Sequence, residues 1–514
     1  MTPEFKKGAK TLPSNLPCHH KRVGAVEWWE TAKSARSAGG RLLALWGADD
    51  RDRDSRYRVY AAYLEADGIA VVGHEMEGGT KPTYPSLREF FPSALRMERA
   101  IFDLLGIKSM EPDHRGWVRH SGWPENTFPL RRDFYGNTQF AVVSKPYSFV
   151  QVEGDGVHEI PVGPVHAGTI EPGHFRFSVV GEKVLRLEER LGYKHKGIEK
   201  RFETMVQKEG HKLAARISGD SAVAYSWAYC TALEAITSTS CPPRSVQLRA
   251  LALEHERLAN HLGDLGALGN DAGFAFGLTQ FSRMKEDLLR TNQAHFGARY
   301  LMDFVVPGGV ESDLPNNAPR LLLDRYNMLE TDVVSMRNTY DNHAGIQDRF
   351  RETGILAHET AWKLDAVGVA ARASGIPHDL RTDFPCPPYD KMNVKVSTQT
   401  SGDVAARVAV RFDELIESLR ICRALVAGLS DGDFRSAVPD AEPGLLGIGV
   451  IEAWRGPVLI ALETGSNGSI RRCHPHDPSW QNWPLLEYAI LGNLVPDFPL
   501  INKSFNLSYS GHDV

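Results

Sequence analysis

Apolar residues recur along this chain at two different spacings. From Ala25 to about Arg36 they fall at helical spacing and stop at Gly39-Gly40, which predicts a helix ended by glycine. Downstream of it, alternating or short apolar runs predict strands at 41–46, 57–63 and 68–73. A helix with several strands indicates a small α+β domain at the N-terminus.

The pattern changes after about residue 160. Two alternating runs, 175–180 and 183–188, flank Gly181-Glu182 and predict a hairpin with a two-residue turn. Apolar residues then recur every three or four positions, predicting helices at 198–209, 217–236, 244–267, 280–303, 317–340, 358–373 and 403–427. Strand-like alternation returns at 447–462. We therefore expect an α+β fold in which a small α+β domain precedes a helical bundle with peripheral strands and a cavity at one end.

Length and composition narrow the class of protein. A chain of 514 residues predicts two or more domains, and 42% hydrophobic with 24% charged residues is ordinary for a globular protein. A net charge of -5 with mixed signs argues against a nucleic-acid partner. Neither an apolar run of membrane-spanning length nor a signal peptide is visible, so we expect a soluble, cytoplasmic chain that reaches a membrane only through partners.

The cysteines and glycines add two exclusions. The six cysteines are dispersed, with no two at metal-ligand spacing, which argues against a metal cluster or a disulfide framework on this chain. Gly39-Gly40 and Gly78-Gly79 lack the strand and helix context of a nucleotide-binding loop.

Three segments carry the candidate chemistry: Gly163–Phe177, Arg216–Ser221 and Ser504–Gly511. The first contains two prolines, three glycines, two histidines, a glutamate and an arginine, and runs into an alternating strand. Such a composition is typical of a tight loop, here one that lines a cavity.

This loop, with its continuation Gly192–Lys200, resembles the large subunit of membrane-bound nickel-iron hydrogenases of the formate hydrogenlyase and hydrogenase-4 type. It also resembles the homologous quinone-site (49 kDa) subunit of respiratory complex I. Upstream, Tyr84–Pro92, Met97–Ile107 and Pro129–Phe134 resemble the small (30 kDa) subunit of complex I. The resemblance implies two fused subunits, with a flexible segment at 1–20, the small-subunit domain at 21–135, a linker at 136–160 and the large-subunit domain at 161–514.

In a hydrogenase of this family the second and third segments would each carry a Cys-x-x-Cys. Here Ser218 and Ser221 stand at the first pair, and Ser508 and Gly511 at the second. Serine hydroxyls are poor nickel ligands. The resemblance therefore implies that these residues line a former metal or quinone cavity, with no metal and no other cofactor held by this chain alone.

The resemblance also assigns chemistry to the loop. Glu171 corresponds to a glutamate that passes protons to and from the metal site, and the alternative is that it pairs with an arginine and only holds the loop. His166 and His174 lie where the complex I relative has two histidines, one of which donates to the quinone headgroup. Either histidine can equally be structural.

The complex I relative places a tyrosine on the other side of the headgroup. That position falls on Gly219 here, so the tyrosine is absent unless Tyr225 or Tyr509 reaches in from elsewhere.

Two further positions follow from the resemblance. Asp271 matches a carboxylate that partners the quinone-site histidine, or else it caps the helix or loop that follows it. Arg455, in Glu452–Pro457, matches an arginine that would place a positive charge over the pocket. On the helix Glu254–His261, Arg257 and His261 are four residues apart and face the same side.

Two functions remain open. The first is a redox subunit of a complex I-like assembly on the cytoplasmic face of the membrane. Electrons would pass from an iron-sulfur cluster on a neighbouring small subunit to a quinone or another carrier, with coupled proton transfer. The second is a non-catalytic scaffold that couples to antiporter-like and other membrane subunits. A working hydrogenase would need ligands that the chain lacks.

Overall fold

The computed structural model describes residues 3–79, 81–120, 122–141 and 146–514. Its N-terminal sheet has the order β1-β2-β5-β4-β3, with β2 and β5 parallel and the other pairs antiparallel. The strands are Lys10–Thr11 (β1), Cys18–Val23 (β2), Arg41–Asp50 (β3), Arg56–Glu65 (β4) and Gly68–Glu77 (β5). The predicted helix forms as α2 (Ala25–Ser37) and the three predicted strands as β3, β4 and β5. The α+β class is confirmed.

Residues 3–20, within the segment expected to be flexible, contain regular structure. After the short helix α1 (Pro3–Lys6), β1 and the start of β2 already belong to the sheet. The Ile448 backbone N–H donates to Pro13 O (2.9 Å), and the Asn15 side chain donates to Val450 O (2.8 Å). Hydrogen bonds to the C-terminal sheet therefore order this segment. Composition alone does not reveal such pairing.

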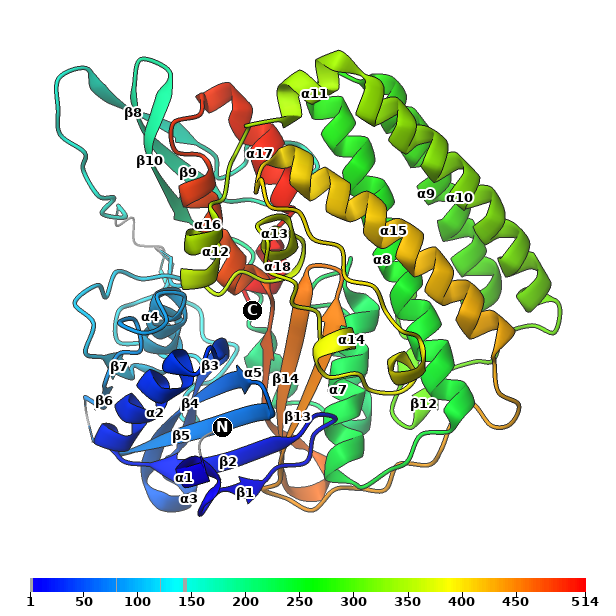
Figure 1. Ribbon diagram of the computed structural model, residues 1–514. Coiled ribbons are helices and arrows are strands. Elements are labelled where there is room, and N and C mark those ends of the chain that lie inside the picture. The colour runs from blue at the N-terminus through cyan, green and yellow to red at the C-terminus, as the bar shows by residue number, and fades with distance from the viewer. Residues whose placement is uncertain (1–2, 80, 121, 142–145) are drawn as a thin grey trace.

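The C-terminal sheet is an antiparallel meander of β13 (Leu446–Ala453), β14 (Gly456–Thr464) and β15 (Ile470–His476). The stretch expected at 447–462 is thus a hairpin whose two-residue turn is Trp454-Arg455. Helix α7 (Ala222–Ile236) packs against β13 and β14. The N-terminal and C-terminal sheets share one apolar core, so the two domains pack as neighbours (Figure 1).

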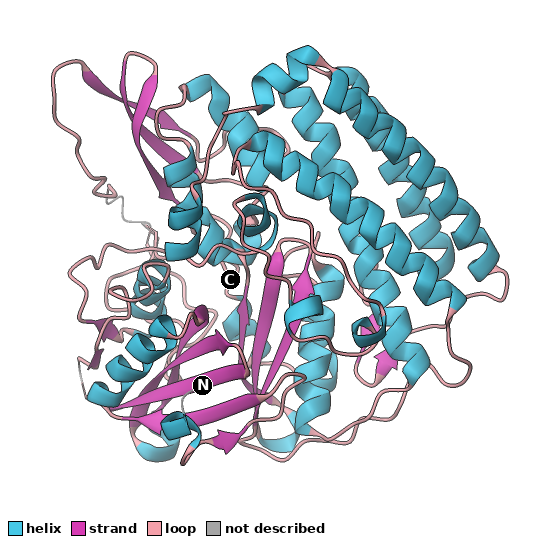
Figure 2. Cartoon of the chain, viewed as in Figure 1, coloured by secondary structure: helices cyan, strands magenta, loops and turns pink. Residues whose placement is uncertain are grey.

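Four long helices, α8 (Pro243–Asp271), α9 (Ala275–Phe296), α10 (Ala318–Asn342) and α15 (Val404–Ala427), form the predicted bundle (Figure 2). Two predicted helices are broken. The stretch 198–209 keeps only α5 (Ile198–Phe202) and a 3-10 turn, and 358–373 divides into α12 (His358–Lys363) and α13 (Gly368–Ala373). The second break contains Asp365 at positive φ (57°), and α13 begins at Gly368, which also has positive φ (61°). Positive φ interrupts helical hydrogen bonding.

A three-stranded sheet of β8 (Val157–Val162), β9 (His174–Val180) and β10 (Lys183–Arg190) projects at the upper left of Figure 1. The predicted hairpin is confirmed, because Val180 pairs with Lys183 across Gly181-Glu182. The loop 163–173 joins β8 to β9. The remaining elements are α3 (Arg51–Asp54), β6 (Thr83–Tyr84), α4 (Ala94–Leu105), β7 (Lys108–Ser109), α6 (Gly210–Ala214), β11 (Val305–Val306), β12 (Gly309–Val310), α11 (Ala344–Phe350), α14 (Leu380–Asp383), α16 (Ser479–Ala489), α17 (Phe498–Phe505) and α18 (Tyr509–His512).

Candidate functional site

The three segments singled out in the sequence meet in space. Ser218 Oγ, just before α7, lies 2.9 Å from Ser508 Oγ, just before α18. Glu171, in the loop between β8 and β9, accepts a hydrogen bond from the Ser510 backbone N–H (3.0 Å). The loop, the start of α7 and the chain end therefore form one polar site.

The serine hydroxyl groups at this site already form hydrogen bonds to other groups of the same chain. Ser218 donates to Asp220 Oδ1 (2.7 Å), so Ser508 supplies the proton of the Ser218–Ser508 hydrogen bond. Ser508 Oγ in turn accepts from the Gly511 backbone N–H (2.9 Å), and a Cβ on Gly511 would overlap Asp477 Oδ2. These residues do not fit a nickel-iron group, which needs free soft ligands. Within the described ranges, no three His, Cys, Asp or Glu side chains are grouped to hold a metal ion.

An ion pair occupies the centre of the site. Arg455, in the β13–β14 turn, donates to both carboxylate oxygens of Asp220 (2.8 and 2.5 Å). Although the surrounding protein opposes ionisation, the charge and hydrogen bonds of Arg455 lower the pKa of Asp220 to about 2. Trp454 Nε1 donates to Asp220 O (2.9 Å), and Ser221 Oγ lies 3.5 Å from Arg455 Nη1. The positive charge expected over the pocket is thus neutralised by a carboxylate.

A series of hydrogen bonds leads from this ion pair toward the helical bundle. Arg455 Nε donates to Asn506 O (2.6 Å), and Asn506 Nδ2 donates to Asp264 Oδ1 (2.6 Å). Tyr225 does not belong to this series of hydrogen bonds, because its buried hydroxyl donates to Asp477 Oδ2 (2.5 Å). Of the two tyrosines considered as substitutes for Gly219, Tyr225 is committed elsewhere.

The two loop histidines have different surroundings. His166 Nε2 lies 3.4 Å from the Tyr509 hydroxyl, so Tyr509 does reach the loop. His174 begins β9; its Nδ1 lies 3.3 Å from Gly163 O and its ring packs against Phe149. Burial lowers the pKa of His174, and its Nε2 is enclosed with no hydrogen-bond partner among the residues that the structure describes. His166 is therefore the loop histidine that contacts a tyrosine.

The two carboxylates assigned to proton transfer lie apart. Glu171 is half-exposed and 3.6 Å from Lys194 Nζ, so its cationic partner is a lysine rather than an arginine. Asp271 is the exposed last residue of α8. Burial nevertheless raises the pKa of Asp271 somewhat, with the charge of Lys503 opposing the shift. Among the described residues, neither carboxylate contacts His166 or His174.

Two acidic residues at the site were not singled out from the sequence. Asp220 stands between Ser218 and Ser221, and its acidic side chain inside that segment was the available signal. Glu256 accepts hydrogen bonds from the backbone N–H groups of Val223 (2.7 Å) and Ala224 (3.2 Å), at the start of α7. Asp220 and Glu256 line one cavity of about 10 Å³, room for a single water molecule.

Comparison with known proteins places this chain in a family. Residues 22–139 match the family described as the respiratory-chain NADH dehydrogenase 30 Kd subunit, and residues 271–445 match the corresponding 49 Kd subunit. Apart from Asp271, the candidate site residues lie outside these two matches.

Full-length relatives extend the likeness. The chain is 31% identical to formate hydrogenlyase subunit 5 of Escherichia coli K12, covering 92% of this chain and 85% of the relative. It is 25% identical to the C/D protein of NADH-quinone oxidoreductase from Bacteroides thetaiotaomicron, covering 84% and 86%. One protein in the structure of the membrane-bound sulfane sulfur reductase, an archaeal respiratory membrane complex, shares the fold with a TM-score of 0.66 at 23% identity, covering 70% of this chain and 99% of that one.

The chain therefore belongs to the hydrogenase large-subunit-like relatives of complex I. In this chain the regions that match the 30 Kd and 49 Kd subunits are fused. It is a peripheral-arm subunit of a complex I-like or hydrogenase-like membrane complex. No helix in the described ranges is both long and apolar enough to cross a bilayer.

Proposed function

We propose that this subunit passes electrons to a quinone, or to a carrier of similar chemistry, at a site formed by His166 and Tyr509. The proposal includes the absence of a nickel-iron centre. The main support is that the Tyr509 hydroxyl lies 3.4 Å from His166 Nε2. In this proposal Tyr509, near the end of the chain, replaces the family tyrosine that is absent at Gly219.

The surroundings of this pair suit an apolar ring with polar ends. Val165 and Ile170 expose 80% and 42% of their surfaces on the same loop. Burial raises the pKa of Tyr509, so its hydroxyl stays protonated and able to donate. Imidazole and phenol groups that lie 3.4 Å apart can both donate to one oxygen of a quinone as negative charge develops there.

Reduction of a quinone to a quinol consumes two electrons and two protons. In this proposal the electrons come from an iron-sulfur cluster on a partner small subunit. Glu171, which is half-exposed and accepts from the backbone N–H of Ser510 beside Tyr509, takes up protons for this reaction from solvent. Antiporter-like and other membrane subunits would hold the complex on the cytoplasmic face of the membrane.

The test is quinone reduction by the natively isolated complex with its cluster chemically reduced. Tyr509→Phe and His166→Ala are each expected to lower the rate about tenfold, the effect of losing one hydrogen bond to a developing charge. His158→Ala, an exposed position on β8, is the matched control and should leave the rate unchanged. Wild-type rates in both site variants would refute the proposed site.

A scaffold without redox chemistry is the second candidate function. The Ser218–Ser508 hydrogen bond and the Asp220–Arg455 ion pair favour it, because both occupy the candidate site with contacts within the chain. If the wild-type complex assembles with its membrane subunits but reduces no quinone under any donor, the scaffold function replaces the redox function.

A further inference from the structure

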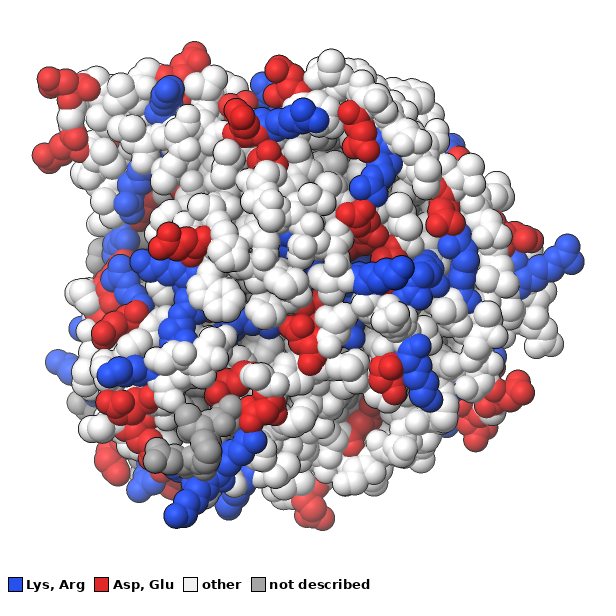
Figure 3. Space-filling view, viewed as in Figure 1, with Lys and Arg blue, Asp and Glu red and all other residues white. Residues whose placement is uncertain are grey.

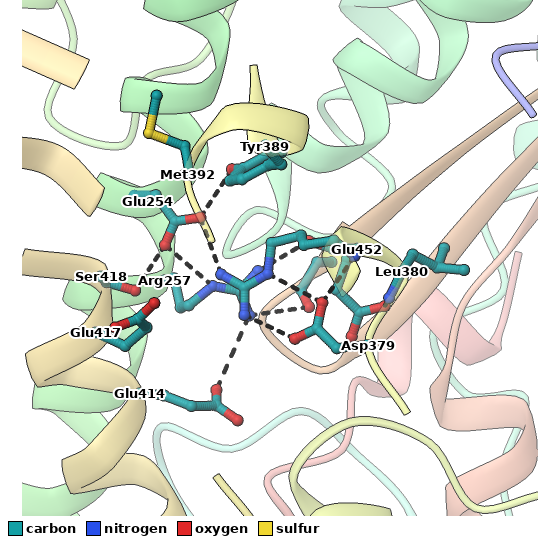
Figure 4. Close-up of polar contacts among 12 residues, drawn as sticks. Glu254, Arg257, Asp379, Leu380, Tyr389, Met392, Glu414, Glu417, Ser418 and Glu452 are labelled. Carbon is teal, nitrogen blue, oxygen red and sulfur yellow. Dashed lines mark hydrogen bonds and ion pairs between the residues drawn. The ribbon is translucent and has the colours of Figure 1, made fainter. Parts of the chain in front are cut away.

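Figure 4 shows part of a group of charged side chains in the interior, where the bundle approaches β13. The group has seven members. Each is at most 6% exposed. We call this group the buried charge cluster; it comprises Glu254 and Arg257 of α8, Arg372 of α13, Asp379 and Arg381 at α14, Glu414 of α15 and Glu452 of β13. The cluster contains four carboxyl groups but three guanidinium groups. Full ionisation would leave one uncompensated negative charge in the interior, which is strongly unfavourable.

We propose that Glu452 is the proton store of this cluster: around neutral pH it binds and releases one proton in response to the charge at the Asp220–Arg455 pair. Only the use of this proton in turnover rests on the proposed redox function.

Geometry distinguishes Glu452 from the other carboxyl groups. Its contacts are long: 3.4 Å from Oε1 to Arg372 Nη1, and 3.2 Å from Oε2 to the Leu380 backbone N–H. The other three are each held by at least two contacts of 3.0 Å or less: Glu254 by Tyr389, Ser418 and Arg381, Asp379 by two nitrogens of Arg381, and Glu414 by Arg372 and His261. The carboxyl group with the weakest stabilisation of its charge takes the proton.

The groups that surround Glu452 lead to the same assignment. Burial and the negative charge of Asp379 raise the pKa of Glu452 to about 7, against the guanidinium groups of the cluster. Arg41 approaches from β3, but it lies 3.8 Å from Asp383 and is balanced by that carboxylate. Burial lowers the pKa of His261, so this ring adds no positive charge near neutral pH.

Consecutive residues of one hairpin connect the cluster to the site. Arg257 donates to the carbonyl oxygens of Glu452 (2.9 Å) and Ala453 (3.3 Å). The next two residues, Trp454 and Arg455, bind Asp220. Ionisation of Glu452 would draw Arg257 toward the new carboxylate and away from these carbonyl groups, shifting the turn that carries Arg455. By thermodynamic reciprocity, a change at Asp220–Arg455 shifts the protonation of Glu452.

The first test is infrared spectroscopy of the natively isolated complex, which detects the carbonyl stretch of a protonated carboxyl group without turnover. Part of the absorbance of protonated carboxyl groups should titrate with a midpoint near pH 7, and this part should be missing in Glu452→Gln. Burial also raises the pKa of Glu98 to about 7, so Glu98 accounts for a band that remains in this variant. Glu256→Gln identifies the separate band of Glu256, whose pKa burial raises to about 8. The matched control is Glu417→Gln, a buried carboxylate of α15 held by Arg420 (2.6 Å), which should retain the Glu452 band. If the absorbance that titrates near pH 7 were the same in Glu452→Gln as in wild type, the assignment would be overturned.

The second test addresses the link, and it also applies if Glu452→Gln fails to assemble. In a Glu256→Gln background, Asp220→Asn leaves the Arg455 charge uncompensated, so the midpoint of the Glu452 band should fall to lower pH. An unchanged midpoint would refute the coupling. Because neither measurement needs quinone reduction, a band that titrates in a complex without quinone activity would refute the proposed function and leave the proton store standing.

Discussion

At the scale of single residues, Glu256 combines two opposing influences. Its carboxyl group caps the start of α7 through Val223 and Ala224, which favours the ionised form. Burial outweighs these hydrogen bonds and raises the pKa of Glu256 from 4.5 to about 8. A helix cap that titrates near neutral pH makes the start of α7, and with it the position of Ser221, dependent on pH.

Glu256→Gln tests this balance. An acid whose pKa is higher in the folded state costs no stability below the unfolded value and progressively more as pH rises from about 4.5 to 8. The variant should therefore gain stability relative to wild type over that interval, by up to about 5 kcal/mol, and the difference should level off above about pH 8. Denaturant unfolding at a series of pH values measures it. Glu359→Gln, at an exposed position of α12, is the control; parallel curves for Glu256→Gln and wild type would contradict the prediction.

At the scale of elements, the sequence predicted features that depend on local patterns. The β9–β10 hairpin, α2 and the long bundle helices follow from periodicity and turn residues. The break within 358–373 was missed, because apolar residues continue at spacings of three and four across Asp365, whereas the helical backbone is interrupted there. The Trp454-Arg455 turn was missed for a similar reason, since alternation runs through both strands of the hairpin.

The candidate site was predictable only in part. The resemblance identified the three segments, and they do meet. It could not supply the partners inside the site, because Asp220 and Arg455 are 235 positions apart and Tyr509 lies 343 positions from His166. Contacts at such separations are determined by how the elements pack rather than by any local pattern.

The short helix α18 provides an element-scale prediction. Restoring a cysteine with Gly511→Cys places a side chain against Asp477 Oδ2 and disturbs the Tyr225–Asp477 hydrogen bond. It should therefore destabilise the protein by about 1–3 kcal/mol, as overpacking does, instead of rebuilding a metal ligand. Gly219→Ala is the control from the same site, since a Cβ there meets nothing within 4 Å. Equal thermal stability of the two variants would show that α18 can move aside.

At the scale of the whole molecule, the two fused domains are joined by charge as well as by their shared core. Arg471 of β15 pairs with Asp50 (2.9 Å) and Asp52 (2.7 Å) of the N-terminal domain. The visible face shows positive and negative side chains intermingled rather than segregated (Figure 3). Close to this interface, Trp46 of β3 stacks on His474 of β15, which in turn contacts Glu199.

Glu199 is the carboxylate on which the last prediction rests. It is 5% exposed, ion-paired with Arg472 and 2.9 Å from His474 Nδ1. Burial opposes its ionisation, but these two partners lower its pKa from 4.5 to about 2. Because the folded-state pKa is depressed, the stabilisation is fully present above about pH 4.5 and is lost as pH falls toward 2.

Glu199→Gln leaves the Arg472 charge buried without its partner. We expect a loss of about 3–5 kcal/mol at pH 7, measured by denaturant unfolding, that shrinks as pH is lowered through about 4.5 toward 2. Glu330→Gln is the control: it removes a more exposed ion pair with Arg423 and should cost at most about 1 kcal/mol. A loss in Glu199→Gln no larger than that of the control would mean that the shared apolar core, rather than this ion pair, holds β15 in place at the junction of the two domains.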